Sequence, residues 1–270
     1  MLGTGIGIGL SGFTVRPAFS GFSPAKLTGV MAWLDGSDFG SLQQSYGGNN
    51  ALADGDPVGA WLDKSGNGRH FIQSSGTNKP TLKTSIINSR SVVRFDGVND
   101  YIDSTGLSST PANLHLFMVV KSDANSAYRR PFTWQSQTGT VWPLYATPMY
   151  SGGVNFDARS ANGQELDGGV FRVSTDISAF YGYEFTFEDS GKQGKIYKSK
   201  TLLGTTSNTS QDTLAGSNKF SRLGSGGVLN TPSSGYWSGD IAEIVIFDRL
   251  ISGADLTSLQ DYLTTKWGAY

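Results

Sequence analysis

The sequence predicts an all-β protein in which two antiparallel sheets pack as a sandwich with one short C-terminal helix. Glycine is abundant, at 36 of 270 residues, and turn-forming residues separate many short apolar runs. The longest of these runs are rich in β-branched and aromatic residues, as strands are. Only the last part of the chain, residues 252–268, carries a helical period instead.

Predicted strands coincide with the apolar runs, and most end at Gly, Asn or Asp residues that favour turns. The run 114–121 is the longest and predicts a central strand, within which His115 is expected to be partly buried. Residues 182–187 and 195–197 are expected to pair around the turn 188–191. The other predicted strands are residues 30–34, 58–62, 91–95 and 241–247.

The predicted helix begins near Ser252, which we expect to cap it with Asp255 as a short-armed capping-box partner. Gly268 is expected to end it. Apolar residues at spacings of three, four and four form one stripe. They are Leu256, Leu259, Leu263 and Trp267.

Composition excludes several classes of function. The chain has no cysteine, which rules out a disulfide framework, a thiolate metal site and a thiol nucleophile. Its 21 Lys and Arg nearly balance 22 Asp and Glu, and no basic stripe is present, so a nucleic-acid partner is not expected. No run approaches the ~18 apolar residues of a membrane span. At this length a single domain is sufficient.

The first 27 residues are predicted to form a glycine-rich arm ahead of the domain 28–270. No Lys or Arg precedes Arg16 and glycines interrupt the apolar residues, which is unlike a secretory signal. The arm is either a flexible segment or an assembly element that packs on a neighbouring subunit. Its apolar residues are Leu2, Ile6, Ile8, Leu10 and Phe13.

Three segments together resemble a known family. They are residues 31–38 (MAWLDGSD), residues 54–101 with the turns DKSGNG and DGVND, and residues 239–249 (GDIAEIVIFDR) followed by the helix and Lys266-Trp267-Gly268. In order and spacing they resemble concanavalin A-like, laminin-G-like jelly-roll domains of bacterial surface proteins and phage structural proteins. The resemblance covers residues 28–270, with a poor match over 122–176, and implies a jelly-roll sandwich. It does not give the function, because this superfamily holds lectins, glycanases and adhesion modules.

The tryptophans in these segments are predicted to lie in the core rather than on a ligand surface, because large aromatic side chains dominate burial. They are Trp33, Trp61 and Trp267. Asp240 and Glu243 are expected to point to opposite sides of a strand, and so not to form a catalytic pair.

No enzymatic motif is complete. Glycanases of this family carry Glu-x-Asp-x-x-Glu on one strand face. Glu165-Leu166-Asp167 begins that pattern, but no second glutamate follows. A nucleophile elbow and a phosphate loop are absent, and two histidines 45 residues apart do not favour zinc. We therefore predict a protein that is not an enzyme.

Calcium is the one metal that the sequence leaves open, and no other cofactor is expected. The turn at residues 63–68 resembles the start of a calcium loop, but Ser74 occupies the twelfth position, which excludes an EF-hand. A second oxygen-rich cluster contains Asp96, Asn99, Asp100 and Asp103. Both clusters can equally be hydrogen-bonded turns. The candidate ligands are Asp63, Asn67, Asp96 and Asp100.

The segment 134–150 is the candidate for ligand recognition. Its aromatic residues stand among Gln, Thr and Pro, a mixture that suits sugar rings or a protein interface. The alternative is that they fill the sandwich. The candidate residues are Trp134, Trp142, Tyr145 and Tyr150.

These observations favour a non-catalytic binding or structural module. The absence of a signal peptide favours a phage virion component, a capsid decoration or tail protein located in the virion. Such a protein can also bind a cell-surface glycan. Its other partners would be virion proteins or sister subunits bound through the arm. One alternative is a secreted or surface bacterial glycan-binding adhesion module, extracellular or on the cell surface. A glycan hydrolase is the least favoured alternative.

Overall fold

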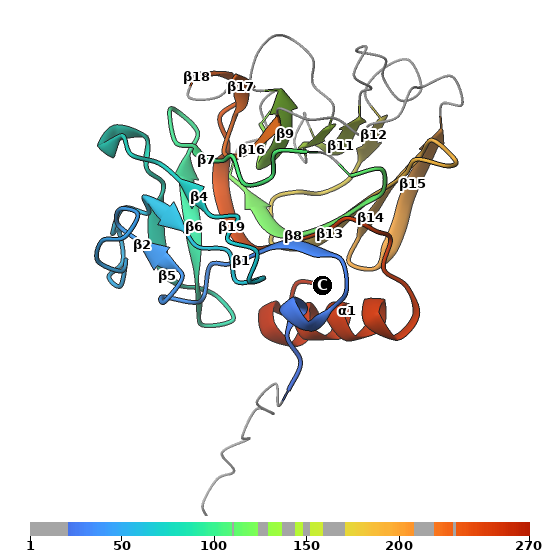
Figure 1. Ribbon diagram of the computed structural model, residues 1–270, viewed down its shortest axis with the longest axis horizontal. Helices are drawn as coiled ribbons and strands as arrows, with labels where there is room; N and C mark the ends of the chain where they lie inside the picture. The colour runs from blue at the N-terminus through green and yellow to red at the C-terminus, as the bar shows by residue number, and fades with distance from the viewer. Residues whose placement is uncertain are drawn as a thin grey trace, which may run out of the picture.

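The computed structural model describes residues 21–109, 111–123, 129–136, 144–147, 152–158, 171–207, 219–228 and 231–270. These residues form a β-sandwich of two large antiparallel sheets with one α-helix on an outer face, which confirms the predicted fold class (Figure 1). Within the described ranges, no helix is long and apolar enough to cross a membrane.

The first sheet, sheet A, has eight strands in the order β15-β14-β13-β8-β19-β6-β5, with β1 paired to β19. Strand β8 lies between β13 and β19, so the longest apolar run is central as predicted. The predicted hairpin is confirmed in the pair β13–β14. The strands are β1 (Val30–Asp35), β5 (Thr81–Ile87), β6 (Arg90–Asp96), β8 (Leu114–Ser122), β13 (Tyr181–Glu188), β14 (Gln193–Lys198), β15 (Thr201–Ser207) and β19 (Ser238–Phe247).

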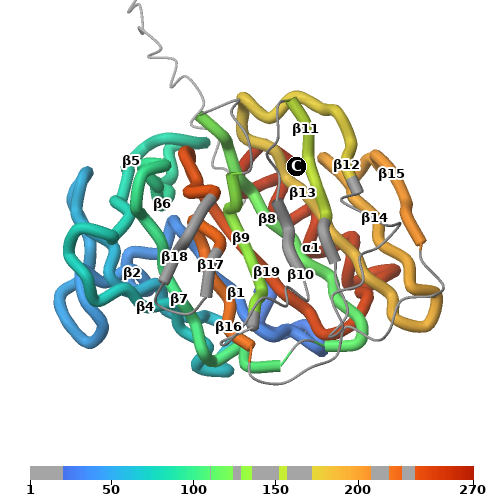
Figure 2. Tube along the Cα trace, turned by 90° about the horizontal axis from the view of Figure 1, so that it is seen from above, coloured from blue at the N-terminus to red at the C-terminus, as the bar shows by residue number. Residues whose placement is uncertain are grey.

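The second sheet, sheet B, has nine strands in the order β12-β11-β10-β9-β16-β7-β4-β3-β2. Seen from above, its strands cross over those of sheet A, and α1 lies beneath both (Figure 2). The strands are β2 (Leu42–Gln43), β3 (Ala60–Trp61), β4 (Phe71–Ile72), β7 (Ile102–Ser104), β9 (Phe132–Ser136), β10 (Leu144–Thr147), β11 (Gly153–Ala158), β12 (Phe171–Ser174) and β16 (Lys219–Leu223). The smaller elements are the hairpin β17 (Gly226–Val228) and β18 (Thr231–Ser234) and the 3-10 helices η1 (Pro24–Lys26) and η2 (Gly76–Asn78).

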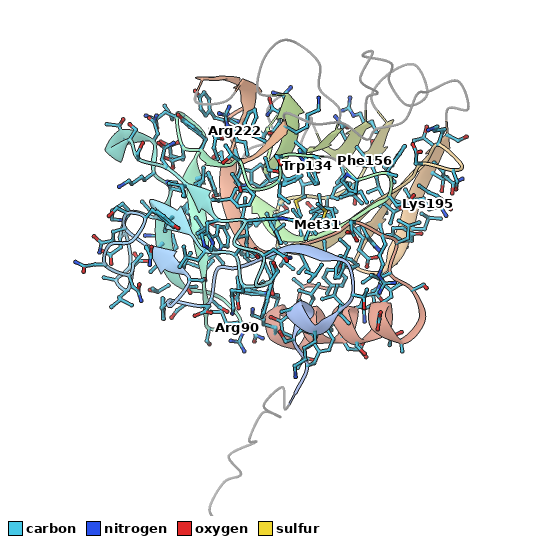
Figure 3. The ribbon with its side chains drawn as sticks, viewed as in Figure 1. Met31, Arg90, Trp134, Phe156, Lys195 and Arg222 are labelled. Atoms are coloured by element: carbon cyan, nitrogen blue, oxygen red, sulfur yellow. The ribbon has the colours of Figure 1, made fainter. Side chains whose placement is uncertain are left out.

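The main core fills the space between the two sheets. Alternate residues along each strand point into it, and Trp134 and Phe156 lie there between the layers (Figure 3). Trp61 is also fully buried in this core, as predicted. Burial of such large side chains, at about 1.5–3 kcal/mol each, is the main source of the sandwich's stability.

A second core lies between sheet A and helix α1 (Gly253–Trp267). Leu259, Leu263 and Trp267 are buried there, and Gly268 ends the helix in the left-handed region at φ 70°. The predicted helix and its apolar stripe are therefore confirmed. The predicted capping box is wrong in detail: the Ser252 side chain makes no capping hydrogen bond, and Asp255 pairs instead with Arg249 at 2.8 Å.

The last residues of the predicted arm pack on the domain. Phe22, Ala25 and Leu27 contact the second core, and the ring centroids of Phe22 and Tyr262 are 5.5 Å apart. Residues 22–27 therefore belong to the folded body. The apolar arm residues lie outside the described residues, and their role in assembly stays a prediction; they are Leu2, Ile6, Ile8, Leu10 and Phe13.

Asp240 and Glu243 share one face of β19, contrary to the prediction. The pairing of β19 with β8 shifts register between Ile241 and Glu243, a β-bulge that adds one residue to β19. As a result Asp240 pairs with Lys121 and Glu243 with Val119, two positions on the same face of β8. The two carboxylates nevertheless serve separate ion pairs, and Asp240 is held by Arg94 at 2.6 and 2.8 Å.

Glu243 is the centre of a buried charge network between sheet A and α1. Its Oε1 accepts hydrogen bonds from the indole of Trp33 (2.6 Å) and the hydroxyl of Tyr262 (2.8 Å). Its Oε2 accepts from the indole of Trp267 (2.5 Å) and pairs with Lys266 Nζ (2.9 Å). Burial raises the pKa of Glu243, although Lys266 opposes this effect.

Asp35 extends the same network toward the loop after β3. Its Oδ1 lies 2.6 Å from Lys266 Nζ, and its Oδ2 lies 2.8 Å from Lys64 Nζ. Burial tends to raise the pKa of this carboxyl, but the two ammonium groups outweigh burial and hold the pKa well below its usual range. The network therefore joins β1, β19 and α1, the elements formed by the residues that carry the family resemblance.

Candidate functional site

A shallow pocket opens on the outer face of sheet B beside β4 and β7, and we call it the β4–β7 pocket. Its volume is about 220 Å³, below the ~300–1,000 Å³ of deep small-molecule sites, so it fits a single ring that remains partly exposed. It is lined by His70, Ile72, Gln73, Ser74, Tyr101, Asp103 and Thr105.

Strand alternation directs this lining outward. Ile102 of β7 and Phe71 of β4 are buried in the core between the sheets. Their neighbours therefore face the opposite side. Ile72 lies directly across from Asp103 in the pairing of β4 with β7, so both side chains meet at the pocket.

The floor of the pocket is a buried ion pair. Arg222 of β16 donates to Asp103 from Nε (2.6 Å) and from Nη2 (2.8 Å), a two-point contact that fixes both groups. The guanidinium also lies 4.6 Å from the ring centroid of Tyr101 and 5.1 Å from that of Phe220. Its Nη1 donates to the carbonyl of Gly226. Arg222 thus holds Asp103 and Tyr101 in place.

The wall of the pocket consists of fixed polar groups, and an exposed tyrosine ring stands next to it. Gln73 donates to the Tyr101 carbonyl and accepts from the amide of Ser75, both at 2.9 Å. His70 Nδ1 accepts the amide proton of residue 63, so its Nε2 carries the ring proton and is a donor. Beside it lies Tyr46, 58% exposed, with ring centroids 5.8 Å apart.

This arrangement is suited to binding rather than to acid–base chemistry. Asp103 is the one carboxylate among the lining residues, and Arg222 neutralises it. Glycoside hydrolysis generally needs two carboxylates flanking the scissile bond. Aromatic faces beside fixed hydrogen-bonding groups can instead stack on a ring and bond its hydroxyls.

Trp134 is not a ligand-facing residue, which corrects one prediction for the aromatic segment. It is fully buried between the sheets, and its indole N–H donates to the carbonyl of Leu107 at 2.9 Å. The backbone of Tyr145 lies in β10, across from Thr133 of β9. Trp142 and Tyr150 lie outside the described residues, as does the segment 165–167, so these predictions stay untested.

The first candidate calcium loop is occupied by hydrogen bonds of its own. The Asp63 carboxylate accepts from the amides of Trp33 and Ser65, at 2.9 and 2.8 Å. Asn67 donates its side-chain N–H to the carbonyl of Val30 at 2.9 Å. The loop therefore clamps β1. In the part of the chain that the structure describes, no group of three or more His, Cys, Asp or Glu is placed to hold a metal ion.

The second oxygen-rich cluster is a tight turn in which Gly97 has a φ of 77°. Asp96 Oδ1 accepts from the amides of Val98, Asn99 and Asp100, at 2.8, 3.1 and 3.3 Å. Asp100 Oδ2 accepts in return from the amide of Asp96 at 2.9 Å. Burial raises the pKa of Asp100 to about 7, and the nearby Asp96 charge adds to this.

We expect Asp100 to make stability depend on pH in a defined window. Because the folded state raises its pKa from 3.8 to about 7, its stabilising contribution is complete below about pH 4 and is lost as the pH rises through about 7. Asp100→Asn keeps an oxygen acceptor for the Asp96 amide but does not titrate. Urea unfolding between about pH 4 and 8 should show a steeper fall in unfolding free energy for the parent than for Asp100→Asn. Equal pH slopes would contradict this.

Sequence reasoning missed most of the pocket. In the sequence Asp103 stands out only as part of an oxygen-rich cluster, and His70 only as one of two histidines that lie 45 residues apart. The available signal is the alternation Tyr101-x-Asp103-x-Thr105, which places three polar-tipped side chains on one strand face. Arg222 comes from a strand 119 residues away, and no local pattern relates it to Asp103.

The sequence matches no protein-family model and no curated protein. Solved structures are similar in fold. The receptor binding domain of botulinum neurotoxin D has a TM-score of 0.56 at 10% identity, covering 89% of this chain and 54% of that chain. The binding domain of Paraclostridial Mosquitocidal Protein 1 has a TM-score of 0.52 at 11% identity, covering 78% and 52%.

The K499G mutant of NanB sialidase from Streptococcus pneumoniae has a TM-score of 0.50 at 15% identity, covering 62% of this chain and 27% of that chain. The chain thus spans about half the length of the two toxin binding domains and a quarter of the sialidase. At these identities the likeness is one of fold: the chain shares a β-sandwich with binding domains of toxins and with part of a sialidase.

Proposed function

We propose that this chain is a non-catalytic carbohydrate-binding module that acts outside the cell or at its surface. The observation that carries the proposal is the β4–β7 pocket, where an exposed aromatic ring stands beside fixed polar groups. Tyr46, next to His70, offers an exposed ring, His70 Nε2 offers a donor, and Asp103 offers oxygens held by Arg222. Sugars present both apolar C–H surfaces and hydroxyls, which these groups complement.

The similar structures support a binding role. Two of them are named as binding domains, of a neurotoxin and of a mosquitocidal protein, and the third belongs to a sialidase that this chain covers only in part. None of these three is a virion component, and nothing in the described structure indicates a place in a virion. The adhesion-module hypothesis therefore accounts for the observations better than the phage hypothesis.

Tyr46→Ala should weaken glycan binding without destabilising the fold, whereas His70→Ala should weaken binding and also remove the acceptor of the residue 63 amide. Tyr46 is 58% exposed, so its ring is available to a ligand and contributes little to the core. Loss of one stacking ring is expected to weaken binding about tenfold. The measurement is a glycan array followed by calorimetric titration of the best ligand with the parent and each variant.

Phe39→Ala is the matched control, because Phe39 is also an exposed aromatic residue, at 39%, but neither lines the pocket nor stands beside His70 as Tyr46 does. It should bind like the parent. A parent protein that binds no glycan on the array would overturn the proposed function. Loss of binding in Phe39→Ala but not in Tyr46→Ala would overturn the location of the site.

A further inference from the structure

Helix α1 lies along the outer face of sheet A, on the side away from sheet B (Figure 1). A second pocket lies between that face and the beginning of α1, and we call it the helix-side pocket. Its volume is about 430 Å³, within the ~300–1,000 Å³ of small-molecule sites. It is lined by His115, Glu184, Thr186, Lys195, Tyr197, Lys200, Leu250, Ile251, Ser252, Leu256 and Gln260.

The floor of this pocket is a buried polar pair on adjacent strands. His115 Nε2 of β8 lies 3.4 Å from Glu184 Oε2 of β13. Gln260 of α1 donates to the other carboxylate oxygen, Oε1, at 2.6 Å. His115 was predicted to be a partly buried strand histidine, and it is in fact only 3% exposed. Glu184 is buried to the same degree, so both groups are fixed by their surroundings.

The ring of His115 presents an unused hydrogen-bonding atom. Because Nε2 faces a carboxylate, that nitrogen carries the proton, and Nδ1 is left as an acceptor. Burial lowers the pKa of His115, which keeps the ring neutral and this acceptor available. Nδ1 is buried and has no hydrogen-bond partner. A buried polar atom without a partner is costly, and His115 is one of the residues that line the pocket.

Other polar groups along the pocket are also unpartnered. Among the residues that the structure describes, the Lys195 ammonium has no ion pair, and the hydroxyls of Thr186 and Tyr197 have no hydrogen bond. Lys200 differs, because it pairs with Asp261 at 3.2 Å. Lys195 stands on β14 at the side of the molecule (Figure 3). Lys195, Thr186 and Tyr197 thus line the cavity together with His115, whose Nδ1 is a buried acceptor.

The remaining lining sets the shape of a ligand. Leu250, Ile251 and Leu256 form an apolar wall opposite the polar groups. Glu184 lies at the floor, where its charge repels an anion, whereas Lys195 attracts one at the other side. A ligand that carries one negative charge is therefore oriented, with its acidic group toward Lys195 and neutral hydroxyls toward His115.

We propose that the helix-side pocket binds a hydroxylated carboxylic acid about the size of one monosaccharide. Its carboxylate pairs with Lys195, one hydroxyl donates to His115 Nδ1, and others bond the hydroxyls of Thr186 and Tyr197. The site is independent of the β4–β7 pocket, since the two open on outer faces of different sheets. The chain would then bind two ligands at the same time, or two groups that belong to the same cell surface.

The test is a titration of the isotope-labelled full chain, followed by amide chemical shifts. The probes are D-glucuronate, D-galacturonate and N-acetylneuraminate, with neutral D-glucose and D-galactose as comparators and acetate as an anion without hydroxyls. Binding of an acidic sugar should shift amides of residues 115, 184, 195 and 197. Lys195→Met should weaken it about tenfold, because one charge-assisted hydrogen bond is lost.

Lys83→Met is the matched control and should leave binding unchanged. Lys83 lies on β5, away from the pocket, and pairs with Asp54. Thr186→Val and Tyr197→Phe remove only a hydroxyl each, and the spectrum of each variant reports whether it is folded. The inference is overturned if none of the acidic sugars shifts the pocket amides. It is also overturned if the neutral sugars bind as tightly as the acidic ones, or if Lys195→Met binds the acidic sugars as tightly as the parent does. Shifts confined to residues 70, 101 and 103 would also overturn it while supporting the proposed function.

Discussion

Glu243→Ala is expected to lower the free energy of unfolding by about 3–5 kcal/mol, the cost of removing one partner from a buried ion pair. The carboxylate is fully enclosed and serves Trp33, Tyr262, Trp267 and Lys266 at once. Without it, two indole N–H groups and one hydroxyl lose their acceptor, and Lys266 keeps Asp35 as its only buried carboxylate. Desolvated donors without partners account for most of the loss.

Urea unfolding followed by tryptophan fluorescence measures this effect. Glu188→Ala is the matched control, because Glu188 ends β13 at a turn and its carboxylate accepts an exposed hydrogen bond from the Ser190 hydroxyl, at 3.2 Å. Its change should stay within about 0.5 kcal/mol, as for most surface substitutions. A loss below about 1 kcal/mol in Glu243→Ala would show that the network contributes little to stability.

Asp103→Ala is expected to cost about 3–5 kcal/mol as well, because it leaves the fully buried Arg222 without its carboxylate. The substitution should also abolish ligand binding in the β4–β7 pocket, since Asp103 forms part of its lining. Denaturant unfolding and glycan titration of the same preparation measure the two effects separately.

The double variant Asp103→Ala/Arg222→Met separates the buried charge from the binding role. Removing both charges should recover a large part of the lost stability. In Asp103→Ala the buried Arg222 guanidinium has lost its carboxylate, and burying it then costs more free energy than burying an apolar side chain of similar length. Ligand binding should not recover, since the oxygens of Asp103 remain absent. If the double variant is no more stable than Asp103→Ala, the stability lost in Asp103→Ala does not come from the buried charge of Arg222.

Local patterns predicted the scaffold well. The run 114–121 became the central strand because its apolar residues serve two cores at once, one on each face of sheet A. The helical stripe ending at Trp267 was visible because its period differs from that of every strand before it. Trp33, Trp61 and Trp267 were predicted to be buried for the same reason: each stands beside an apolar run.

The candidate sites depend on contacts that no local pattern encodes. His115 and Glu184 are 69 residues apart, and Arg222 and Asp103 are farther apart still. The bulge in β19 reversed the expected relation of Asp240 and Glu243, because one inserted residue moves every following side chain to the other face. Trp134 was misassigned because a buried aromatic residue and a sugar-stacking one have the same neighbours in sequence.

The network around Glu243 also determines when, during synthesis of the chain, folding can be completed. Trp33 stands on the first strand of sheet A and Trp267 near the end of α1, yet both donate to one carboxylate. A ribosome must therefore release residue 267 before the network can close, so sheet A cannot complete its packing during most of synthesis. A chain shortened before Gly253 would lack α1 and expose the apolar face of β1, β8 and β19 that the helix covers. Such fragments should be captured by chaperones or aggregate rather than fold.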